Sequence, residues 1–408
     1  MPATEVARVL LVSIGYPPLD GGVATSTHRV ARNLCLLGCE ILVLTFDYKT
    51  ALSGDDCVVL EKDGAVEIRR FGPFYRHHDI DDKEIAEARR RVYDQMEIAA
   101  KGFRPTVVLS FYAANAGLLG AYLANALGVP HVVGVRGDDV GRNVFSTKWL
   151  PTLRIILDLS TRIVCVNEHL RARLLLAFPN MADRTSVIMN GLELPVGFEP
   201  RKSRNYLRGA TDWREGCPVA VFIGNPREKK GIRPLLRAVE SLGLDSELRV
   251  LIVGPTLKEC DRNDCGEIWD RLISSSRLHV TGQVDRRSAL QIAAEGDMII
   301  MPSVDDGLAN GLLEGMALGL CPIASDIFSD IVKSEACGWV FRRGDSNALA
   351  AALVAAIENT ARRCSLASMA KRRIAEHHAP QKEAESYLRL FKGLYGHAIK
   401  NGKMKRES

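Results

Sequence analysis

Short apolar runs alternate with amphipathic stretches along the first half of the chain. The apolar runs are rich in Val, Ile and Leu, and in the stretches between them apolar residues recur with the spacing of a helix. The apolar runs predict strands at residues 9–14, 41–46, 66–71, 107–111, 131–135, 163–166 and 186–189. The amphipathic stretches predict helices at residues 23–37, 82–101 and 168–178. This alternation is typical of a doubly wound α/β lobe with parallel strands.

The alternation stops at residues 192–218, which are rich in Pro, Gly and charge, and then resumes. The second series predicts strands at residues 219–223, 248–253, 277–281, 298–301 and 321–325. It predicts helices at residues 232–242, 287–294, 308–318, 347–359, 361–375 and 381–399. The sequence therefore predicts two Rossmann-like lobes. We expect a cleft between them at the carboxyl ends of their strands, where α/β sheets bind ligands.

One long apolar segment, residues 105–135, contains no Asp, Glu, Lys or Arg and is long enough to cross a bilayer. Its pattern is instead that of a strand, an alanine-rich helix and a second strand, with a break from Gly128 to Pro130. We expect a buried strand–helix–strand unit.

Composition narrows the class of protein. A chain of 408 residues with 47% hydrophobic and 25% charged residues is typical of a globular protein with at least two domains. The net charge of +5 suits an anionic ligand or a membrane surface, but it predicts no nucleic-acid partner. The ten cysteines are scattered and the N-terminus lacks a secretory pattern, so we expect free thiols and a cytoplasmic protein. Cys260, Cys265 and His279 lack a second cysteine pair, and no metal site is predicted.

The stretch from Met301 to Met316, which reads MPSVDDGLANGLLEGM, carries the most informative chemistry. An apolar strand runs into a Pro-Ser corner and an acidic loop, and the helical pattern starts at Leu308. Amides at a helix start bind phosphate, while the carboxylates of Asp306 and Glu314 suit hydroxyl groups. This combination fits a nucleotide sugar.

Four other motifs occur in order along the chain. They are YPP followed by GG within residues 16–22, HVVGVRGDD at residues 131–139, SVIMNG at residues 186–191 and FIGNPREKKG at residues 222–231. With the acidic motif, they make the sequence resemble the retaining glycosyltransferases of family 4 over nearly its whole length. The resemblance implies the GT-B fold, in which two Rossmann-like lobes face a cleft.

The resemblance also implies a role for each part of the chain. Residues 1–195 would form the acceptor-side lobe, residues 196–217 a linker, and residues 218–378 the lobe that binds the nucleotide sugar. Residues 379–408 would form a C-terminal helix that packs back toward the N-terminal lobe.

In the second lobe, the resemblance implies a phosphate loop after the first strand. Gly224 would allow close backbone approach, and Lys230 would meet the donor diphosphate, whose charge grows as the nucleotide leaves. The family usually has arginine where this chain has Asn225, and Arg227 could reach the same phosphates.

In the acidic motif, the resemblance assigns a separate task to each end. Asp306, where the family commonly has glutamate, would hold hydroxyls of the donor sugar. The amides of Gly307, Leu308 and Ala309 would line the sugar and phosphate, and Glu314 would accept hydrogen bonds from the ribose hydroxyls. Aspartate is one methylene shorter than glutamate, so the sugar geometry could differ.

In the first lobe, the glycine-rich loop with Gly21 and Gly22 would face the donor. Arg136 occupies the place of a family histidine near the reacting sugar. Because arginine stays protonated, it would bind a hydroxyl or phosphate and not act as a base. Asp138 would accept a proton or orient a group, and His131 is expected to be a core residue of the sheet.

These assignments predict a retaining hexosyltransferase. It would move a sugar from a UDP-, GDP- or ADP-sugar to a hydroxyl of a polysaccharide, a lipid-linked glycan or a small glycoside, and it would need no cofactor. From the family, the leaving diphosphate would help to deprotonate the incoming hydroxyl, while the protein positions the reactants.

Several alternatives stay open or are disfavoured. A catalytically silent GT-B-like protein would bind a nucleotide sugar or a partner without turnover. The triplet Asp79-Ile80-Asp81 matches the metal-binding pattern of the other nucleotide-sugar transferase fold. A dehydrogenase is disfavoured because no strand is followed by Gly-x-Gly-x-x-Gly.

Peripheral contact with the inner face of the membrane is a further expectation. The predicted helix at residues 82–101 carries Arg89, Arg90 and Arg91 beside apolar positions and could lie on anionic lipid. The alternative is an ordinary solvated helix.

Overall fold

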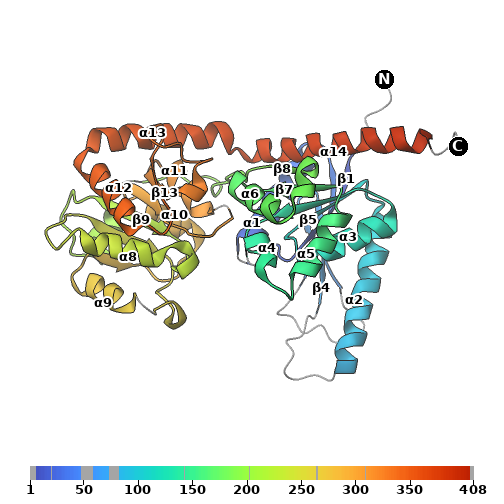
Figure 1. Ribbon diagram of the computed structural model, residues 1–408, viewed down its shortest axis with the longest axis horizontal. Coiled ribbons are helices and arrows are strands. Elements are labelled where there is room, and N and C mark those ends of the chain that lie inside the picture. Colours follow the sequence, from blue (N-terminus) through green and yellow to red (C-terminus); the bar gives the residue numbers. More distant parts are fainter. Residues whose placement is uncertain are drawn as a thin grey trace. The chain divides into compact units, whose positions relative to one another are not determined.

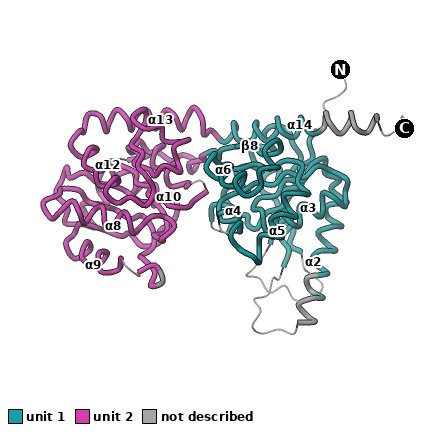
Figure 2. Tube along the Cα trace, in the orientation of Figure 1, with its two compact units in different colours: residues 1–191, 380–408 teal, residues 192–379 magenta. Residues whose placement is uncertain are grey.

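The computed structural model describes the chain at residues 6–19, 21–46, 58–72, 82–141, 143–201, 203–262, 265–307 and 309–404. The chain forms two compact units, which Figure 2 distinguishes by colour. Unit 1 consists of Met1–Gly191 and Pro380–Ser408, and unit 2 consists of Leu192–Ala379.

Unit 1 has an eight-stranded sheet in the order β3-β4-β2-β1-β5-β6-β7-β8. Its strands are β1 (Arg8–Ser13), β2 (Glu40–Phe46), β3 (Val58–Asp63), β4 (Val66–Phe71), β5 (Val107–Phe111), β6 (His131–Val135), β7 (Arg162–Cys165) and β8 (Thr185–Val187). Neighbouring strands are parallel except β3 and β4, which are antiparallel. The apolar runs of β1, β2 and β5 are buried almost throughout, as expected for strands that are covered on both faces.

Helices cover both faces of this sheet (Figure 1). On one face, α1 (Gly22–Leu36) and α14 (Pro380–Met404) add apolar side chains to the core. On the other face, α2 (Asp82–Phe103) and α3 (Asn115–Leu127) do the same. Unit 1 also contains α4 (Asp138–Gly141), η1 (Asn143–Phe145), α5 (Leu150–Leu159), α6 (Glu168–Ala177) and η2 (Pro179–Arg184).

Unit 2 has a six-stranded parallel sheet in the order β11-β10-β9-β12-β13-β14. Its strands are β9 (Val219–Ile223), β10 (Arg249–Val253), β11 (Leu278–Val280), β12 (Met298–Met301), β13 (Cys321–Ser325) and β14 (Trp339–Phe341). Its α-helices are α7 (Asn205–Ala210), α8 (Ile232–Ser241), α9 (Gly266–Ser274), α10 (Arg286–Ala293), α11 (Asn310–Ala317), α12 (Ser346–Glu358) and α13 (Thr360–His377). Its 3₁₀ turns are η3 (Glu228–Lys230), η4 (Glu259–Asp261) and η5 (Asp326–Phe328).

The helices of unit 2 also pack on both faces of its sheet. The apolar sides of α8, α9 and α12 contribute to the core on one face, and those of α10 and α11 to the core on the other. The prediction of two Rossmann-like α/β sheets is therefore confirmed.

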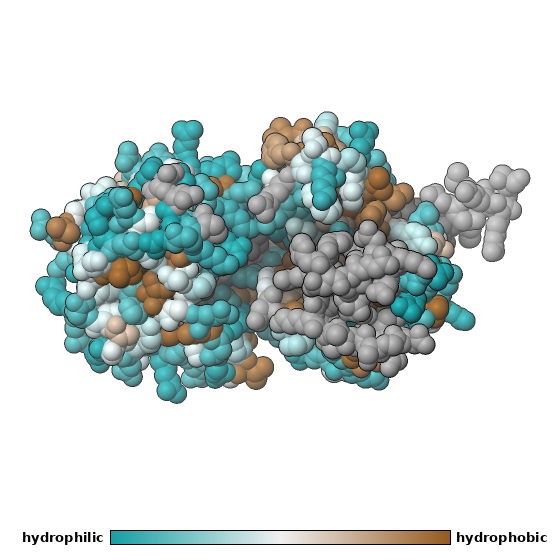
Figure 3. All heavy atoms as spheres, turned by 90° about the horizontal axis from the view of Figure 1, so that it is seen from below, coloured by the Kyte–Doolittle hydropathy of each residue, from teal (hydrophilic) through white to brown (hydrophobic). Residues whose placement is uncertain are grey.

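On the face that Figure 3 draws, hydrophobic residues form small patches among hydrophilic ones.

The apolar segment at residues 105–135 folds as β5, α3 and β6, so the strand–helix–strand prediction is confirmed. Within the described ranges, no helix combines the length and the apolar character that a membrane crossing needs. The stretch at residues 192–218, where the alternation stops, contains one short helix that the sequence pattern did not predict, α7. This helix has six residues, too few to show a helical period, and Leu207 anchors it in the core.

Candidate functional site

The candidate donor site lies in unit 2, where the loops after β9 and β12 meet. Gly224 follows β9 with a φ of 128°, a conformation that residues with a side chain rarely adopt. Gly231 ends the same loop with a φ of 74°, and a Cβ atom there would lie 1.9 Å from the carbonyl oxygen of Pro302. The backbone amide of Val304 donates a hydrogen bond to the carbonyl oxygen of Lys229 at 3.0 Å. The loops approach this closely because residue 231 lacks a side chain.

Lys230 and Asp306 form an ion pair where these loops meet. The Lys230 ammonium contacts Oδ2 of Asp306, and the two side chains are 25% and 12% exposed. Asp306 Oδ1 accepts a hydrogen bond from the amide of Gly307 at 2.9 Å, and Oδ2 accepts one from the Ser303 hydroxyl at 3.4 Å. The structure thus brings together the cation and the acid to which the family resemblance assigns the diphosphate and the sugar. A diphosphate would compete with Asp306 for the ammonium.

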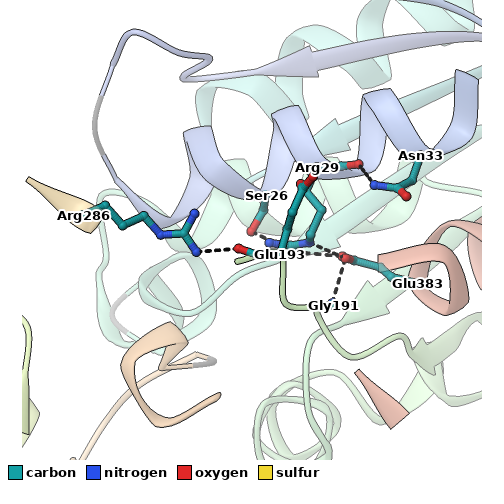
Figure 4. A network of polar contacts seen from close by, with 7 residues as sticks. All are labelled: Ser26, Arg29, Asn33, Gly191, Glu193, Arg286 and Glu383. Atoms are coloured by element: carbon teal, nitrogen blue, oxygen red, sulfur yellow. Dashed lines mark hydrogen bonds and ion pairs between the residues drawn. The ribbon is translucent and has the colours of Figure 1, made fainter. Parts of the chain in front are cut away.

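Glu314, the second acid, lies in α11 with its side chain 10% exposed. Its Oε1 accepts hydrogen bonds from Arg286 Nε at 3.1 Å and Nη2 at 2.9 Å. Arg286 Nη2 also donates to the carbonyl oxygen of Glu193 at 2.7 Å, and Figure 4 shows this guanidinium pointing toward Glu193. The Arg286 guanidinium offsets the cost of burying the Glu314 carboxylate. Arg286 lies outside the sequence motifs.

Close packing places the start of α11 beside β9. A Cβ atom on Gly311 would lie 2.8 Å from the carbonyl oxygen of Ile223, so glycine lets the helix approach the strand. Ala309 is the N-cap residue of this helix, and the amide of Gly307 donates to Asp306. Leu308, the third residue of the predicted amide group, lies outside the described residues.

Asn225 and Arg227 interact within the loop after β9. With the Asn225 amide oxygen facing the guanidinium, it accepts hydrogen bonds from Arg227 Nε at 3.2 Å and Nη2 at 3.0 Å. Arg227 is exposed, and its guanidinium carries further N–H donors of the kind that bind anions. Asn225, which replaces the usual arginine of the family, therefore orients the arginine two residues later.

In unit 1, the predicted glycine-rich loop ends at the start of α1. Gly21 is the N-cap residue with a φ of 134°, and Gly22 is the first residue of the helix. The carbonyl oxygen of Gly21 accepts a hydrogen bond from the amide of Thr25 at 3.0 Å. A Cβ atom on Gly21 would meet no described atom within 4 Å, so its backbone conformation and not lack of space favours glycine.

Arg136 follows β6, and its guanidinium lies 4.0 Å from the centroid of the Phe111 ring. Its Nη1 and Nη2 atoms are buried and donate no hydrogen bond to any residue that the structure describes. Burial lowers the pKa of Arg136, and the nearby Tyr387 and Glu383 side chains oppose this shift. Unused donors on a buried guanidinium are suited to a hydroxyl or phosphate oxygen.

The carboxylate that holds the loop after β6 belongs to Asp139, to which the motif at residues 131–139 assigned no role. It accepts hydrogen bonds from the amides of Ala113 at 2.8 Å, Arg136 at 3.0 Å and Gly137 at 2.7 Å. Burial raises the pKa of the Asp139 carboxyl, and these amides oppose the shift. Asp138 precedes it as the first residue of α4 and is partly exposed, so its predicted role in catalysis stays a prediction.

His131 is a core residue, as predicted. Its Nε2 atom lies 2.8 Å from the Ser110 hydroxyl, and its Nδ1 atom lies 3.0 Å from the Ser160 hydroxyl. Burial lowers the pKa of His131 to about 3. The imidazole is therefore neutral near pH 7, and both of its nitrogens are used inside unit 1.

A buried network joins α14 to α1 in unit 1. Glu383 accepts hydrogen bonds from Arg29 Nε at 2.7 Å and from the amide of Gly191 at 2.8 Å. Arg29 also donates to Ser26, and Asn33 donates to the Arg29 carbonyl oxygen; Figure 4 shows these side chains converging on Arg29. The Arg29 and Glu383 side chains are 3% and 1% exposed, so each charge depends on the other for compensation.

Two possible metal-binding patterns of the sequence lie partly or wholly outside the described residues. The triplet at residues 79–81 is not described, and neither is the Cys260 side chain. The Cys265 thiol donates to the Asp261 carbonyl oxygen, and His279 Nε2 lies 3.1 Å from the Tyr206 hydroxyl. Elsewhere in the described chain, no three His, Cys, Asp or Glu side chains are grouped as metal ligands would be.

Comparisons with known proteins agree with this fold. The model of glycosyltransferase family 4 matches residues 20–194, and the model of glycosyl transferases group 1 matches residues 217–359. An uncharacterized glycosyltransferase of Methanocaldococcus jannaschii is 23% identical, over 90% of this chain and 93% of that protein.

Solved structures resemble both units. Sucrose-phosphate synthase from Thermosynechococcus elongatus has a TM-score of 0.75 at 19% identity, over 96% of this chain and 100% of that one. The Anabaena protein Alr3699/HepE in complex with UDP-glucose has a TM-score of 0.70 at 17% identity, over 95% of this chain and 100% of that one. These similarities show the fold.

Proposed function

Because the chain belongs to glycosyltransferase family 4 of the GT-B fold, we propose that it transfers a sugar from a nucleoside-diphosphate sugar to a hydroxyl acceptor, with retention at the anomeric carbon. The contact between Lys230 and Asp306 carries this proposal. It combines a cation for phosphate with an acid for sugar hydroxyls at the carboxyl ends of parallel strands, where α/β sheets bind ligands. The Anabaena relative in complex with UDP-glucose supports a nucleotide sugar as donor.

Each donor group would meet a different part of the site. Lys230 would move from Asp306 toward the diphosphate, and Asp306 would then accept hydrogen bonds from sugar hydroxyls. Arg227, held by Asn225, would add a second cation near the phosphates. Glu314 has a second carboxylate oxygen besides the one that binds Arg286, and this oxygen would accept from the ribose hydroxyls. The loop that begins at Gly224 and the amides of Gly307 and Ala309 would surround these groups.

The reaction would break the bond between the anomeric carbon and the diphosphate oxygen. The acceptor oxygen would bond to the same face of the sugar, and its proton would pass to the leaving diphosphate. Lys230 would stabilise the charge that grows on that diphosphate, which is the effect expected to matter most. In unit 1, the Arg136 guanidinium, whose Nη1 and Nη2 donate to no described residue, would bind a substrate oxygen. Asp138 would orient the acceptor hydroxyl, and Gly21 and Gly22 would leave room for the donor.

Donor binding is tested by a thermal-shift panel with UDP, GDP, ADP and their common sugars, because a ligand that binds the native state raises its melting temperature. We expect one nucleotide series to stabilise the protein. Release of the free nucleotide on adding an acceptor panel then tests transfer. No shift with any nucleotide would contradict the proposed donor class.

A second candidate function is a catalytically silent protein that binds a nucleotide sugar. The observation that favours it is the departure from the family pattern at two site residues, Asn225 where the family usually has arginine and Asp306 where it commonly has glutamate. Under this alternative, a nucleotide sugar raises the melting temperature but no acceptor releases the nucleotide. Under the main proposal, stabilisation and release occur with the same donor.

Peripheral membrane contact by α2 is part of the proposal, because lipid-linked glycans are among the acceptors considered. Arg90 and Arg91 are exposed, and so are the apolar side chains of Tyr93 and Ile98 on the same helix. The Arg89 side chain lies outside the described part of the chain. Sedimentation with liposomes tests this contact, and we expect binding only when the liposomes contain anionic lipid. Equal sedimentation with neutral and anionic liposomes, or no sedimentation with either, would contradict this contact.

A further inference from the structure

A groove runs along the edge of the sheet in unit 2, beside β11. Its volume is about 1260 Å³, and none of the described residues that line it belongs to the candidate donor site. We name it the β11 groove and define it by Trp213, Trp269, Ile273, Ser276, His279 and Gln283. Pockets for one small ligand usually have roughly 300–1,000 Å³. The β11 groove therefore has room for a ligand of several rings.

Trp213 is held in a fixed orientation within this groove. Its indole Nε1 donates a hydrogen bond to the Ser276 carbonyl oxygen at 2.6 Å. The ring also meets His279 edge-on, with centroids 6.2 Å apart, and His279 is held by Tyr206 at 3.1 Å. Trp213 is half-buried and lines the groove, so its indole is a rigid apolar surface available to a ligand.

The charges around the groove disfavour an anionic ligand. Arg262 is its one described lining cation, and its Nη2 lies 2.5 Å from Asp270 Oδ2 in an ion pair. Asp212 adds a further carboxylate, which accepts a hydrogen bond from the Ser276 hydroxyl at 3.0 Å. Burial lowers the pKa of His279, so the imidazole is neutral at pH 7. Phosphates and anionic lipids would meet a net negative lining.

A neutral ligand with both apolar faces and hydroxyl groups fits these observations best. One face of a sugar ring presents C–H groups that can pack on the indole of Trp213. Its hydroxyls can donate to Asp212 and exchange hydrogen bonds with Gln283, both of which are exposed. Arg262 and Asp270 can also form hydrogen bonds with ligand hydroxyls while their ion pair remains.

We propose that the β11 groove binds a neutral oligosaccharide, stacked on Trp213. The site is separate from the candidate donor site. That the bound oligosaccharide is part of the acceptor or product rests on the proposed function. A glycan held in this groove would stay bound to the enzyme between transfers. Long acceptors would therefore have a lower KM than short ones.

The binding test uses the full chain and neutral oligosaccharides. Maltooligosaccharides, mannooligosaccharides and cellooligosaccharides of increasing length are titrated in the presence of saturating UDP, GDP and ADP together, with saturation-transfer difference NMR as the readout. We expect at least one series to bind, with affinity that rises with length. Trp213→Ala should weaken this binding roughly tenfold or more, because it removes the stacking ring. Trp149→Ala removes a comparably half-buried indole from unit 1 and should leave binding unchanged.

Ile273→Glu provides a second variant in case Trp213→Ala does not fold. Ile273 is 40% exposed and lines the groove, so glutamate adds charge there at little cost to folding. It should also abolish binding. Absence of binding by every series to the wild-type protein, or wild-type affinity in folded Trp213→Ala or Ile273→Glu, would overturn the proposal.

Lys230→Ala separates this inference from the proposed function. Its glycan binding should match wild type although transfer is lost, whereas Trp213→Ala should keep nucleotide release with a short acceptor. If no variant or acceptor gives transfer while Trp213→Ala still loses glycan affinity, the proposed function fails and the β11 groove assignment stands. If transfer depends on Lys230 but glycan affinity does not depend on Trp213, the β11 groove assignment fails and the proposed function stands.

Discussion

Removal of the Lys230 ammonium tests the candidate donor site most directly. In Lys230→Ala, no ammonium would meet the charge that develops on the leaving diphosphate. Loss of one such preorganised group costs about 10²–10³ in kcat, or ~2.7–4 kcal/mol of transition-state stabilisation. We expect a loss of this size, with the donor still bound through the remaining contacts of the site.

The same substitution also removes the partner of Asp306. Breaking a fully buried pair costs about 3–5 kcal/mol, whereas exposed pairs contribute ~0.2–1 kcal/mol. The side chains of Lys230 and Asp306 are 25% and 12% exposed, and Asp306 keeps its bonds from Gly307 and Ser303. We therefore expect a destabilisation of ~1–2 kcal/mol. A domain with about 5–15 kcal/mol of stability stays folded after this loss.

The assay combines nucleotide release with thermal melting of the same preparation. Lys229→Ala is the matched control, since it truncates the neighbouring lysine and keeps the carbonyl that binds Val304 and Asp305. We expect Lys229→Ala to retain most of the turnover. Wild-type kcat in folded Lys230→Ala, or an equal loss in both variants, would refute the role given to the ammonium.

Three further predictions concern residues whose contacts are equally specific. Arg286→Ala leaves the 10%-exposed Glu314 carboxylate without its guanidinium, so donor KM should rise and the melting temperature should fall; an unchanged KM would contradict the link to the donor. Gly231→Ala would place Cβ 1.9 Å from the Pro302 carbonyl at a positive φ, so urea denaturation should show a loss of at least ~2 kcal/mol, and an unchanged midpoint would be inconsistent with this packing. Burial lowers the pKa of His131 to about 3, so its stabilising effect is complete above the unfolded pKa of about 6.5 and is lost as pH falls toward the folded value. The urea midpoint should fall more steeply between about pH 7 and 4 in the wild type than in His131→Gln, and parallel curves would count against this explanation.

Strands inside the sheets could be predicted from the sequence because both of their faces are buried. The runs at β1 and β2 are almost wholly apolar, as this position requires. β3 lies at the edge, ends in polar residues and pairs antiparallel with β4, so the apolar pattern does not predict it. Asp63 followed by Gly64, which has a φ of 59°, is a turn signal that could have located this hairpin.

The contacts within the candidate site could be predicted less well than its motifs. Local spacing carries no information about the pairing of Glu314 with Arg286 or of Asp139 with Ala113, because these partners come from separate segments. One signal was available for Arg286, which lies in the first turn of α10, where the helix dipole favours acids. A basic residue at that position indicates that its side chain forms an interaction stronger than its unfavourable one with the helix dipole.

The anchoring of α14 in unit 1 has a consequence for synthesis of the chain. Tyr387, Phe391 and Leu394 complete the core that contains β1 and β2, and Glu383 neutralises the buried Arg29. The ribosome produces these residues only after all of unit 2. Domains often fold as they emerge. Unit 1 therefore lacks part of its hydrophobic core until α14 has been synthesised. Unit 2 can reach its native state before unit 1 does.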